Sequence, residues 1–441
     1  MSQKQALIRG TFILTFTGLL TRVIGFFYRI FLSRTFYAEG VGLYQLVFPV
    51  YALCFSFTTA ALQVALSRLV AKYTALNQKE ISIRVLKSAL FISIILSLAA
   101  VIFIQSNAAR IASEILHDER CSELLVAMSW AFPFASIHSC ITGYYLGLKG
   151  SGIPALSQLI EQLVRVLSVF FLYQMGLHMK MGTPVTIAVF GLVFGEIASA
   201  CYSIFMLRRL LFFPSGSLPG YVRPAWELVQ LSFPLMASRV LLNFLQSAES
   251  ILIPISLNRY GMTLTDSLSM YGVLTGMALP CILFPSAITN SVSTMLLPTV
   301  AEIQASRSED KLPSLIRKVI FSCFLLGFLS MIAFLMTGNL IGNLIFHNTQ
   351  VGKFIMTMAF ICPFLYTNAT LISILNGLGK TTSTFIINSC GLLIRIYSIY
   401  FLIPSYGILA YLHGLLASQL TITILSLLLI IRSLRTSGQN K

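Results

Sequence analysis

Long apolar runs alternate with short polar segments along the whole chain of 441 residues. Breaking these runs at Gly, Pro and charged residues gives twelve segments near the roughly 20 residues that a helix needs to cross a hydrocarbon core. The pattern therefore predicts an all-α membrane protein with about twelve transmembrane helices. The predicted spans are 10–33, 41–68, 88–106, 124–148, 154–175, 184–207, 228–257, 268–298, 319–345, 354–377, 382–403 and 407–431.

The composition agrees with this pattern and excludes other classes. Apolar residues make up 56% of the chain and charged residues only 10%, whereas a soluble protein has about 25% charged residues. A soluble globule, a disulfide scaffold and a disordered chain are thereby excluded. The eight cysteines form no Cys/His cluster at metal-ligand spacing, so no metal site and no cofactor are predicted.

The net charge of +16 would suit a nucleic acid partner, but the placement of the basic residues argues against one. If the N-terminus is cytoplasmic, the cytoplasmic segments carry 19 Lys and Arg and the outer loops carry six. Such an asymmetry is typical of cytoplasmic loops, whose positive charges resist translocation. Both termini are predicted to be cytoplasmic, and the basic charge is interpreted as a determinant of membrane topology.

The two halves of the chain resemble each other at an offset of 230 residues. The matching pairs include Pro133/Pro363, Phe134/Phe364, Gly147/Gly377, Arg165/Arg395, Ser168/Ser398, Gly42/Gly272 and Ala71/Ala301. Six helices duplicated as six keep the same membrane orientation, which favours two parallel bundles around a central cavity. The predicted domains are an N-terminal lobe (1–210), a cytoplasmic linker (211–225) and a C-terminal lobe (226–441).

Charged residues inside the predicted spans are the main functional candidates, because a lipid-facing charge costs at least ~2.5–3.5 kcal/mol at mid-membrane. These residues include five arginines but only three carboxylates, so at least two positive charges need water or an anionic ligand as a counter-charge. The eight residues are Arg22, Arg29, Arg165, Arg239, Arg395, Glu161, Glu196 and Glu249.

The first predicted helix has one polar face formed by Thr15, Gly18, Arg22, Gly25 and Arg29. The two arginines stand about 10 Å apart along the axis, and guanidinium groups bind phosphate oxygens in a bidentate fork. Both are therefore predicted to bind substrate, with the other three residues lining a cavity. The alternative is that the glycines pack closely on another helix while the arginines reach the membrane interfaces.

The seventh predicted helix has a similar face, formed by Arg239, Asn243, Gln246 and Glu249. Because this helix is the repeat mate of the first, Arg239 is predicted to bind substrate, with Asn243 and Gln246 lining the cavity. The alternative is an internal network in which Arg239 and Glu249 satisfy each other.

Glu161 and Arg165 stand four residues apart on the fifth predicted helix, a spacing that favours a local ion pair. Arg395 repeats Arg165, but Gly391 replaces the glutamate. Arg395 is therefore predicted to be the less neutralised of the two and to bind substrate.

Glu196 is either a proton or cation site or the partner of an arginine. Glu161, Arg165, Glu196 and Glu249 are thus candidates for ion coupling, with Na⁺ or H⁺ as the ion, or for structural pairs. His138 and His413 are interpreted as interhelical hydrogen-bonding groups, with a proton relay as the alternative. No HExxH, GxSxG, GxxxxGK[ST] or GxGxxG motif occurs, so neither an enzyme nor a nucleotide-driven pump is predicted.

Three segments resemble the stage V sporulation protein B family, of the polysaccharide-transporter branch of the multidrug/oligosaccharidyl-lipid/polysaccharide exporter superfamily. They are residues 38–46 (AEGVGLYQL) with the preceding residues 25–29 (GFFYR), residues 157–166 (SQLIEQLVRV) and residues 296–298 (LLP). Two features depart from the family. Gln63 replaces a proline, which puts a helix kink there in question, and twelve predicted helices replace the fourteen that many members have.

The resemblance implies a MATE-like fold and a multi-pass protein of the bacterial cytoplasmic membrane. It implies a flippase for an undecaprenyl-pyrophosphate-linked glycan or peptidoglycan precursor, serving cortex synthesis in spore formers. First-helix arginines of related lipid II flippases are thought to meet the pyrophosphate, which implies that role for Arg22 and Arg29. The alternatives are a cation-coupled multidrug exporter of the same fold and, from another class, a membrane scaffold or glycan-processing enzyme.

Overall fold

The computed structural model describes residues 3–178, 185–211, 219–305 and 312–439, and every regular element within these ranges is a helix. The chain divides into two compact units. Unit 1 consists of Met1–Tyr28 and Leu43–Ser247, and unit 2 consists of Arg29–Gly42 and Ala248–Lys441. Neither unit is one continuous stretch of sequence.

The elements are labelled in chain order, with π-helical stretches marked η. They are α1 (Gln3–Phe55), η1 (Ser56–Ala60), α2 (Ala61–Ala75), α3 (Lys79–Arg110), η2 (Ile111–Ile115), α4 (Cys121–Ser129), α5 (Ala131–Gly147), α6 (Gly152–His178), α7 (Thr186–Leu211), α8 (Pro219–Arg259), α9 (Leu264–Gly272), η3 (Val273–Ala278), α10 (Leu279–Leu283), α11 (Ser286–Ala305), α12 (Leu312–Leu340), η5 (Ile341–Ile345), α13 (Thr349–Ala359), α14 (Cys362–Gly377), α15 (Thr381–Tyr397), η6 (Ser398–Leu402), α16 (Ile403–Tyr406) and α17 (Ile408–Gln439).

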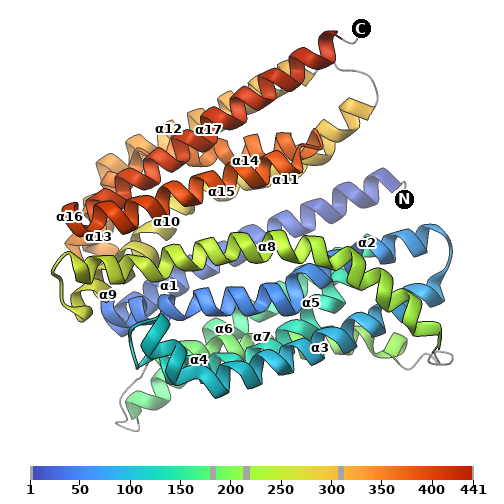
Figure 1. Cartoon of the computed structure of the whole chain (residues 1–441), viewed down its shortest axis with the longest axis horizontal. Helices are drawn as coiled ribbons and strands as arrows, with labels where there is room; N and C mark the ends of the chain where they lie inside the picture. Colours follow the sequence, from blue (N-terminus) through green and yellow to red (C-terminus); the bar gives the residue numbers. More distant parts are fainter. Residues whose placement is uncertain (1–2, 179–184, 212–218, 306–311, 440–441) are drawn as a thin grey trace. The chain divides into compact units, whose positions relative to one another are not determined.

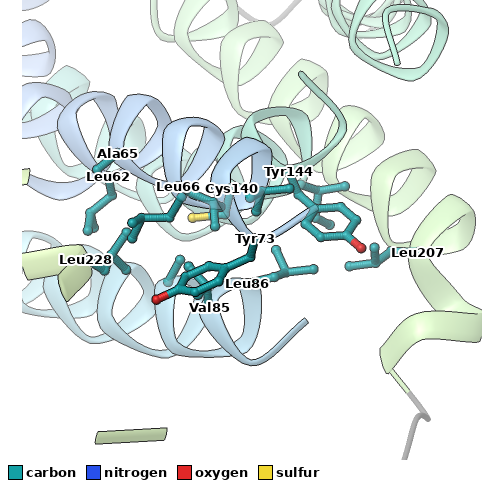
Figure 2. Packing of buried hydrophobic residues seen from close by; sticks show 14 residues of the cluster. Leu62, Ala65, Leu66, Tyr73, Val85, Leu86, Cys140, Tyr144, Leu207 and Leu228 are labelled. Carbon is teal, nitrogen blue, oxygen red and sulfur yellow. The ribbon is translucent and has the colours of Figure 1, made fainter. Parts of the chain in front are cut away.

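In unit 1, α5 is the central helix, because α2, α3, α6 and α7 all pack against it (Figure 1). A buried apolar cluster joins α2, α3 and α5, and Leu207 of α7 and Leu228 of α8 complete it. Figure 2 shows Leu66, Leu86 and Cys140 among the side chains gathered there. Helices in lipid associate mainly through close van der Waals packing, which such a cluster supplies.

Unit 2 repeats this arrangement 230 residues later. Its α14 packs against α11, α12, α15 and α17, and their buried side chains form a second apolar cluster. Several positions of the two clusters are repeat mates. These pairs are Leu66/Leu296, Val70/Val300, Leu86/Ile316, Ile141/Leu371 and Tyr144/Ile374. The same offset relates η2 to η5, so the repeat extends to local irregularities of the helices.

Among the described residues, nine helical segments are long and apolar enough to cross a membrane, or eleven if each of two bent helix pairs is one span. One of them, Phe12–Ala75, has 64 residues and about 96 Å of helix, far more than a hydrocarbon core of about 30 Å. It is broken at Tyr37, whose φ of 57° and ψ of −176° are not helical. With each bent pair counted as one span and the two arms of this segment counted separately, the described residues give twelve spans, which is the predicted number.

Two glycines allow helices of unit 2 to touch through their backbones. A Cβ atom on Gly42 of α1 would lie 2.1 Å from the carbonyl oxygen of Leu268, and one on Gly272 would lie 2.1 Å from that of Ala38. No side chain fits at such distances, so only glycine permits this crossing of α1 and α9. Gly42 and Gly272 are repeat mates, which places the crossing at equivalent positions of the two halves.

Some predicted boundaries are wrong. Of the predicted linker 211–225, residues 212–218 lie outside the described residues, whereas residues 219–225 already belong to α8. The predicted span 268–298 is interrupted at Phe284 and Pro285, and its second part, α11, continues to Ala305. Apolar content alone did not reveal this break, because the interrupted segment is apolar on both sides. The division into lobes 1–210 and 226–441 stays a prediction.

Candidate functional site

Three ionisable side chains of unit 1 meet inside the helix bundle. His138 comes from α5, Glu161 from α6 and Glu196 from α7, and one polar atom of each lies within 4.8 Å of the others. The Nδ1 atom of His138 is 3.5 Å from Oε2 of Glu196. We call these three residues the acidic cluster. The separate predictions for Glu161 and Glu196 thus converge on one place.

Two glycines of α7 bring Glu196 to this position. A Cβ atom on Gly195 would lie 2.7 Å from the carbonyl oxygen of Glu161, and one on Gly191 would lie 3.0 Å from that of Arg165. Because these glycines are one turn apart, the backbone of α7 approaches α6 along a line that includes Glu161. The spacing of Gly191 and Gly195 is the sequence signal that indicates this contact, which the charged residues alone do not predict.

The partners of the two carboxylates differ. Arg165 pairs with Oε1 of Glu161, as the spacing of the two residues predicts, and that prediction is confirmed. Glu196 is 5% exposed and accepts a hydrogen bond of 3.3 Å from the hydroxyl of Tyr51, but its Oε2 atom has no hydrogen-bond partner within the described residues. A buried carboxylate oxygen without a partner is energetically costly. The acidic cluster and Arg165 together therefore carry one unbalanced negative charge when His138 is neutral.

Unit 2 contains a second buried carboxylate, that of Glu249, which has an arginine and a tyrosine as partners. Arg395 of α15 donates a hydrogen bond of 2.9 Å to Oε1 of Glu249, and the hydroxyl of Tyr411 donates one of 2.8 Å to the same atom. Arg395 therefore has a carboxylate partner of its own, and its predicted role in binding substrate stays a prediction. The missing glutamate at position 391 is replaced by Glu249 of α8, which lies 146 residues away in the sequence.

The proposed alternative pairing of Glu249 with Arg239 does not occur, because Glu249 is bound to Arg395. On α8, Asn243 instead bonds to the hydroxyl of Ser56, and the hydroxyl of Ser247 donates to the carbonyl of Pro49 at 3.1 Å. This face of α8 thus holds the second arm of α1 and η1 within unit 1. Gln246, on the same helix, is exposed.

Arg22 and Arg239 share an environment that sets them apart from the paired arginines. Both side chains are exposed and both belong to unit 1. Within the part of the chain that the structure describes, neither forms an ion pair or a hydrogen bond with another side chain. Two guanidinium groups on apolar helices are thus available to an external anion.

The remaining residues of the first predicted helix's polar face have different surroundings. Arg29 is half-buried and donates a hydrogen bond of 3.4 Å to the carbonyl of Thr275 in unit 2. A Cβ atom on Gly18 would meet nothing within 4 Å, and one on Gly25 would meet the amide of Gln162 at 3.4 Å. The alternative that both glycines pack tightly on another helix is therefore wrong for Gly18. Thr15 is half-buried, and its role in lining a cavity stays a prediction.

Comparison with known proteins places these features in a family. The sequence model described as polysaccharide biosynthesis protein matches residues 7–304, more than half of the chain. The chain belongs to this family. It is also 27% identical over 429 residues to stage V sporulation protein B of Bacillus subtilis (strain 168), covering 96% of this chain and 83% of that protein.

Solved structures of transporters share the fold of this family member. The lipid II flippase MurJ in an inward closed conformation matches with a TM-score of 0.74 and 14% identity, over 95% of this chain and 87% of the other. An inward-facing multidrug resistance MATE family transporter of the MOP superfamily matches with a TM-score of 0.70 and 13% identity, over 94% and 96%. The predicted all-α membrane fold is confirmed, and the family match agrees with the predicted polysaccharide-transporter branch.

Proposed function

We propose that this protein moves an undecaprenyl-pyrophosphate-linked oligosaccharide or peptidoglycan precursor across the bacterial cytoplasmic membrane by alternating access. The pyrophosphate is the part of the substrate that the protein binds inside the membrane region, while the lipid tail stays in the bilayer. The membership in a polysaccharide biosynthesis family and the likeness to stage V sporulation protein B support this substrate class.

The observation that carries the proposal is the pair of exposed arginines, Arg22 and Arg239. Three other described arginines of the predicted spans have partners: Arg165 has Glu161, Arg395 has Glu249, and Arg29 has a backbone carbonyl. A positive charge without a protein partner is expensive in a membrane helix unless water or an anion accompanies it. A pyrophosphate supplies several oxygen atoms that two guanidinium groups can bind.

Removing either guanidinium is expected to weaken substrate binding. A charge-assisted hydrogen bond contributes about 1.5–3 kcal/mol, so Arg22→Ala should lower the flipping rate at limiting substrate about 10- to 150-fold. Arg22→Lys should retain part of the activity, since it keeps the charge and loses the fork. The measurement is the rate at which a fluorescent undecaprenyl-pyrophosphate-linked sugar changes leaflet in proteoliposomes.

Arg110→Ala is the matched control. Arg110 lies at the end of α3 and pairs with Glu114, with 73% of its side chain exposed. It is expected to leave the flipping rate unchanged. If Arg22→Ala and Arg239→Ala flip the lipid as fast as the wild type, the proposed pyrophosphate site is wrong. If the wild type flips no pyrophosphate-linked lipid under any condition, the substrate class is wrong.

The buried acidic cluster favours a second candidate, a cation-coupled multidrug exporter, because such a protein needs carboxylates away from water. The structural likeness to a MATE family transporter agrees with it. The two functions differ in what they require from the arginines. Efflux of a cationic dye that depends on Glu196 and is unaffected by Arg22→Ala would favour the exporter over the flippase.

A further inference from the structure

The acidic cluster of unit 1 has a feature that the arginines and the pyrophosphate leave unexplained. Only 5% of Glu196 is exposed, and its Oε2 atom has no hydrogen-bond partner among the described residues. That atom faces Nδ1 of His138 across 3.5 Å. A proton placed between these two atoms would complete the missing interaction and remove the unbalanced negative charge.

We propose that His138 and Glu196 together bind one exchangeable proton, and that this proton is the coupling ion of the transport cycle. The second clause rests on the proposed flippase function, whereas the first does not. When the proton arrives from water, the imidazole becomes an imidazolium and the charge of the cluster with Arg165 changes from −1 to zero. When it leaves, the two carboxylates again share a single guanidinium.

The other charged groups around the pair fit this exchange. Arg165 of α6 holds Glu161 of the same helix, so one carboxylate is neutralised permanently and the other is left for the proton. From α1, Tyr51 donates to Glu196. Tyr28 and Tyr44 of α1 lie near Arg165. Within the described residues, these side chains complete the electrostatic neighbours of His138, Glu161 and Arg165.

A proton fits the cluster better than a metal cation. Hard cations such as Na⁺ or Mg²⁺ prefer a shell of several oxygen atoms. The acidic cluster instead offers a nitrogen atom, a carboxylate already bound by a guanidinium, and a single carboxylate oxygen without a partner in the described part of the chain. Histidine and carboxylate groups within membrane helices are typical of proton relays. The proposed proton is assigned to the pair as a whole, because it lies between Nδ1 of His138 and Oε2 of Glu196.

The repeat offers a natural substitution for testing the pair. At the matching positions of unit 2, Asn368 stands for His138 and Ser426 stands for Glu196. Asn368 is buried and hydrogen-bonded to Gln419, so an asparagine at this register is compatible with the fold. His138→Asn is therefore a variant that should fold, and Glu196→Gln keeps the shape of the second partner.

The first experiment observes the proton directly. The protein has five histidines, so ¹⁵N-histidine NMR in nanodiscs resolves each imidazole, and the signal lost in His138→Asn identifies His138. The signal is recorded from about pH 5 to pH 8, the window in which an ordinary imidazole changes charge. We expect it to change with pH, and we expect this pH dependence to shift in Glu196→Gln and to stay the same when Na⁺ is added. His413→Asn, an exposed position in unit 2, is the control and should leave the His138 signal unchanged.

Either of two results would overturn the proton site: a His138 signal that does not change over this pH range, or one that Na⁺ shifts at constant pH. The second experiment imposes a gradient of one pH unit on proteoliposomes containing the fluorescent pyrophosphate-linked lipid. With one proton per cycle, the ratio of lipid in the two leaflets should change about tenfold in the wild type, and it should not respond in His138→Asn.

The two proposals fail separately. A wild type that flips the lipid but ignores the pH gradient would overturn proton coupling and leave the flippase standing. A wild type whose His138 signal titrates as expected, but which flips no pyrophosphate-linked lipid, would overturn the proposed function and leave the proton site standing.

Discussion

Arg165 of unit 1 and Arg395 of unit 2 stand at matching positions of the repeat, 230 residues apart, yet they obtain their carboxylates by different routes. Arg165 takes its partner from its own helix, one turn earlier, and Arg395 takes one from α8. Unit 1 adds Glu196 and His138, where unit 2 has Ser426 and Asn368. The acidic cluster with Arg165 is thus left with a surplus negative charge, whereas the Arg395–Glu249 pair is neutral.

The packing of the helices explains part of this difference. In unit 1 the small residues at the contact between α6 and α7 are Gly191 and Gly195 of α7. The α6 side of this contact therefore does not need a glycine and has Glu161 there. In unit 2 the small residue is Gly391 of α15, at the position that matches Glu161. A glycine cannot supply a carboxylate, so the neutralising acid has to come from another helix. Both units of the duplicated bundle thus keep the arginine, but they differ in which helix carries the glycines at the contact and which helix carries the carboxylate that pairs with the arginine.

The largest expected effect is on the neutral pair of unit 2. Glu249→Gln leaves the guanidinium of Arg395 mostly buried, with 19% of its side chain exposed, and without a counter-charge. Losing one partner of a buried pair costs about 3–5 kcal/mol of unfolding free energy. Glu196→Gln in unit 1 removes a surplus charge and is expected to change stability by less than about 1 kcal/mol. Unfolding midpoints in detergent measure both.

Restoring neutrality in unit 2 is the control for that prediction. The double variant Glu249→Gln/Arg395→Gln should recover much of the loss, because no unpaired charge then remains. Equal losses for Glu249→Gln and Glu196→Gln would contradict the assignment of a balanced unit and an unbalanced one.

A smaller effect is expected at the glycines that differ between the units. Gly195→Ala would push a Cβ atom to 2.7 Å from a backbone oxygen, whereas Gly391→Ala would meet mainly the flexible end of Ile422 at 2.6 Å. Overpacking of this kind costs about 1–3 kcal/mol, and we expect the larger loss in Gly195→Ala, since backbone cannot move aside easily. Thermal unfolding of the two variants side by side decides the order, and a reversed order would contradict it.

The smallest effect concerns the two tyrosines that donate to the buried glutamates. Tyr411→Phe removes a hydrogen bond of 2.8 Å to Glu249, and Tyr51→Phe removes one of 3.3 Å to Glu196. A typical hydrogen bond contributes about 0.5–1.5 kcal/mol, and the shorter one should contribute more. The same unfolding assay compares them. A larger loss for Tyr51→Phe would indicate that Glu196 depends on its protein partners more than the comparison implies.

The spacing of residues along the sequence predicted the features that depend only on residues within one helix. The number of spans and the Glu161–Arg165 pair follow from helical geometry, which the sequence displays directly. The pairing of Arg395 with Glu249 depends on which faces of α8 and α15 meet, and this depends on packing across 146 residues of sequence. The meeting of His138 with Glu196 has the same origin. Gly191 and Gly195 carried a usable signal, because small residues one turn apart indicate a close helix contact.

The interleaved membership of the two units has a consequence for how the chain is made. Residues 29–42 belong with unit 2, and residues 219–247 belong with unit 1. During synthesis, the early arm that ends at Gly42 must therefore wait for α9 to leave the ribosome before its backbone contact with Gly272 can form. Severing the chain between α7 and α8 would deprive each fragment of helices that its own bundle needs. Maturation of this protein is thus a joint event of both halves, in which neither completes its packing alone.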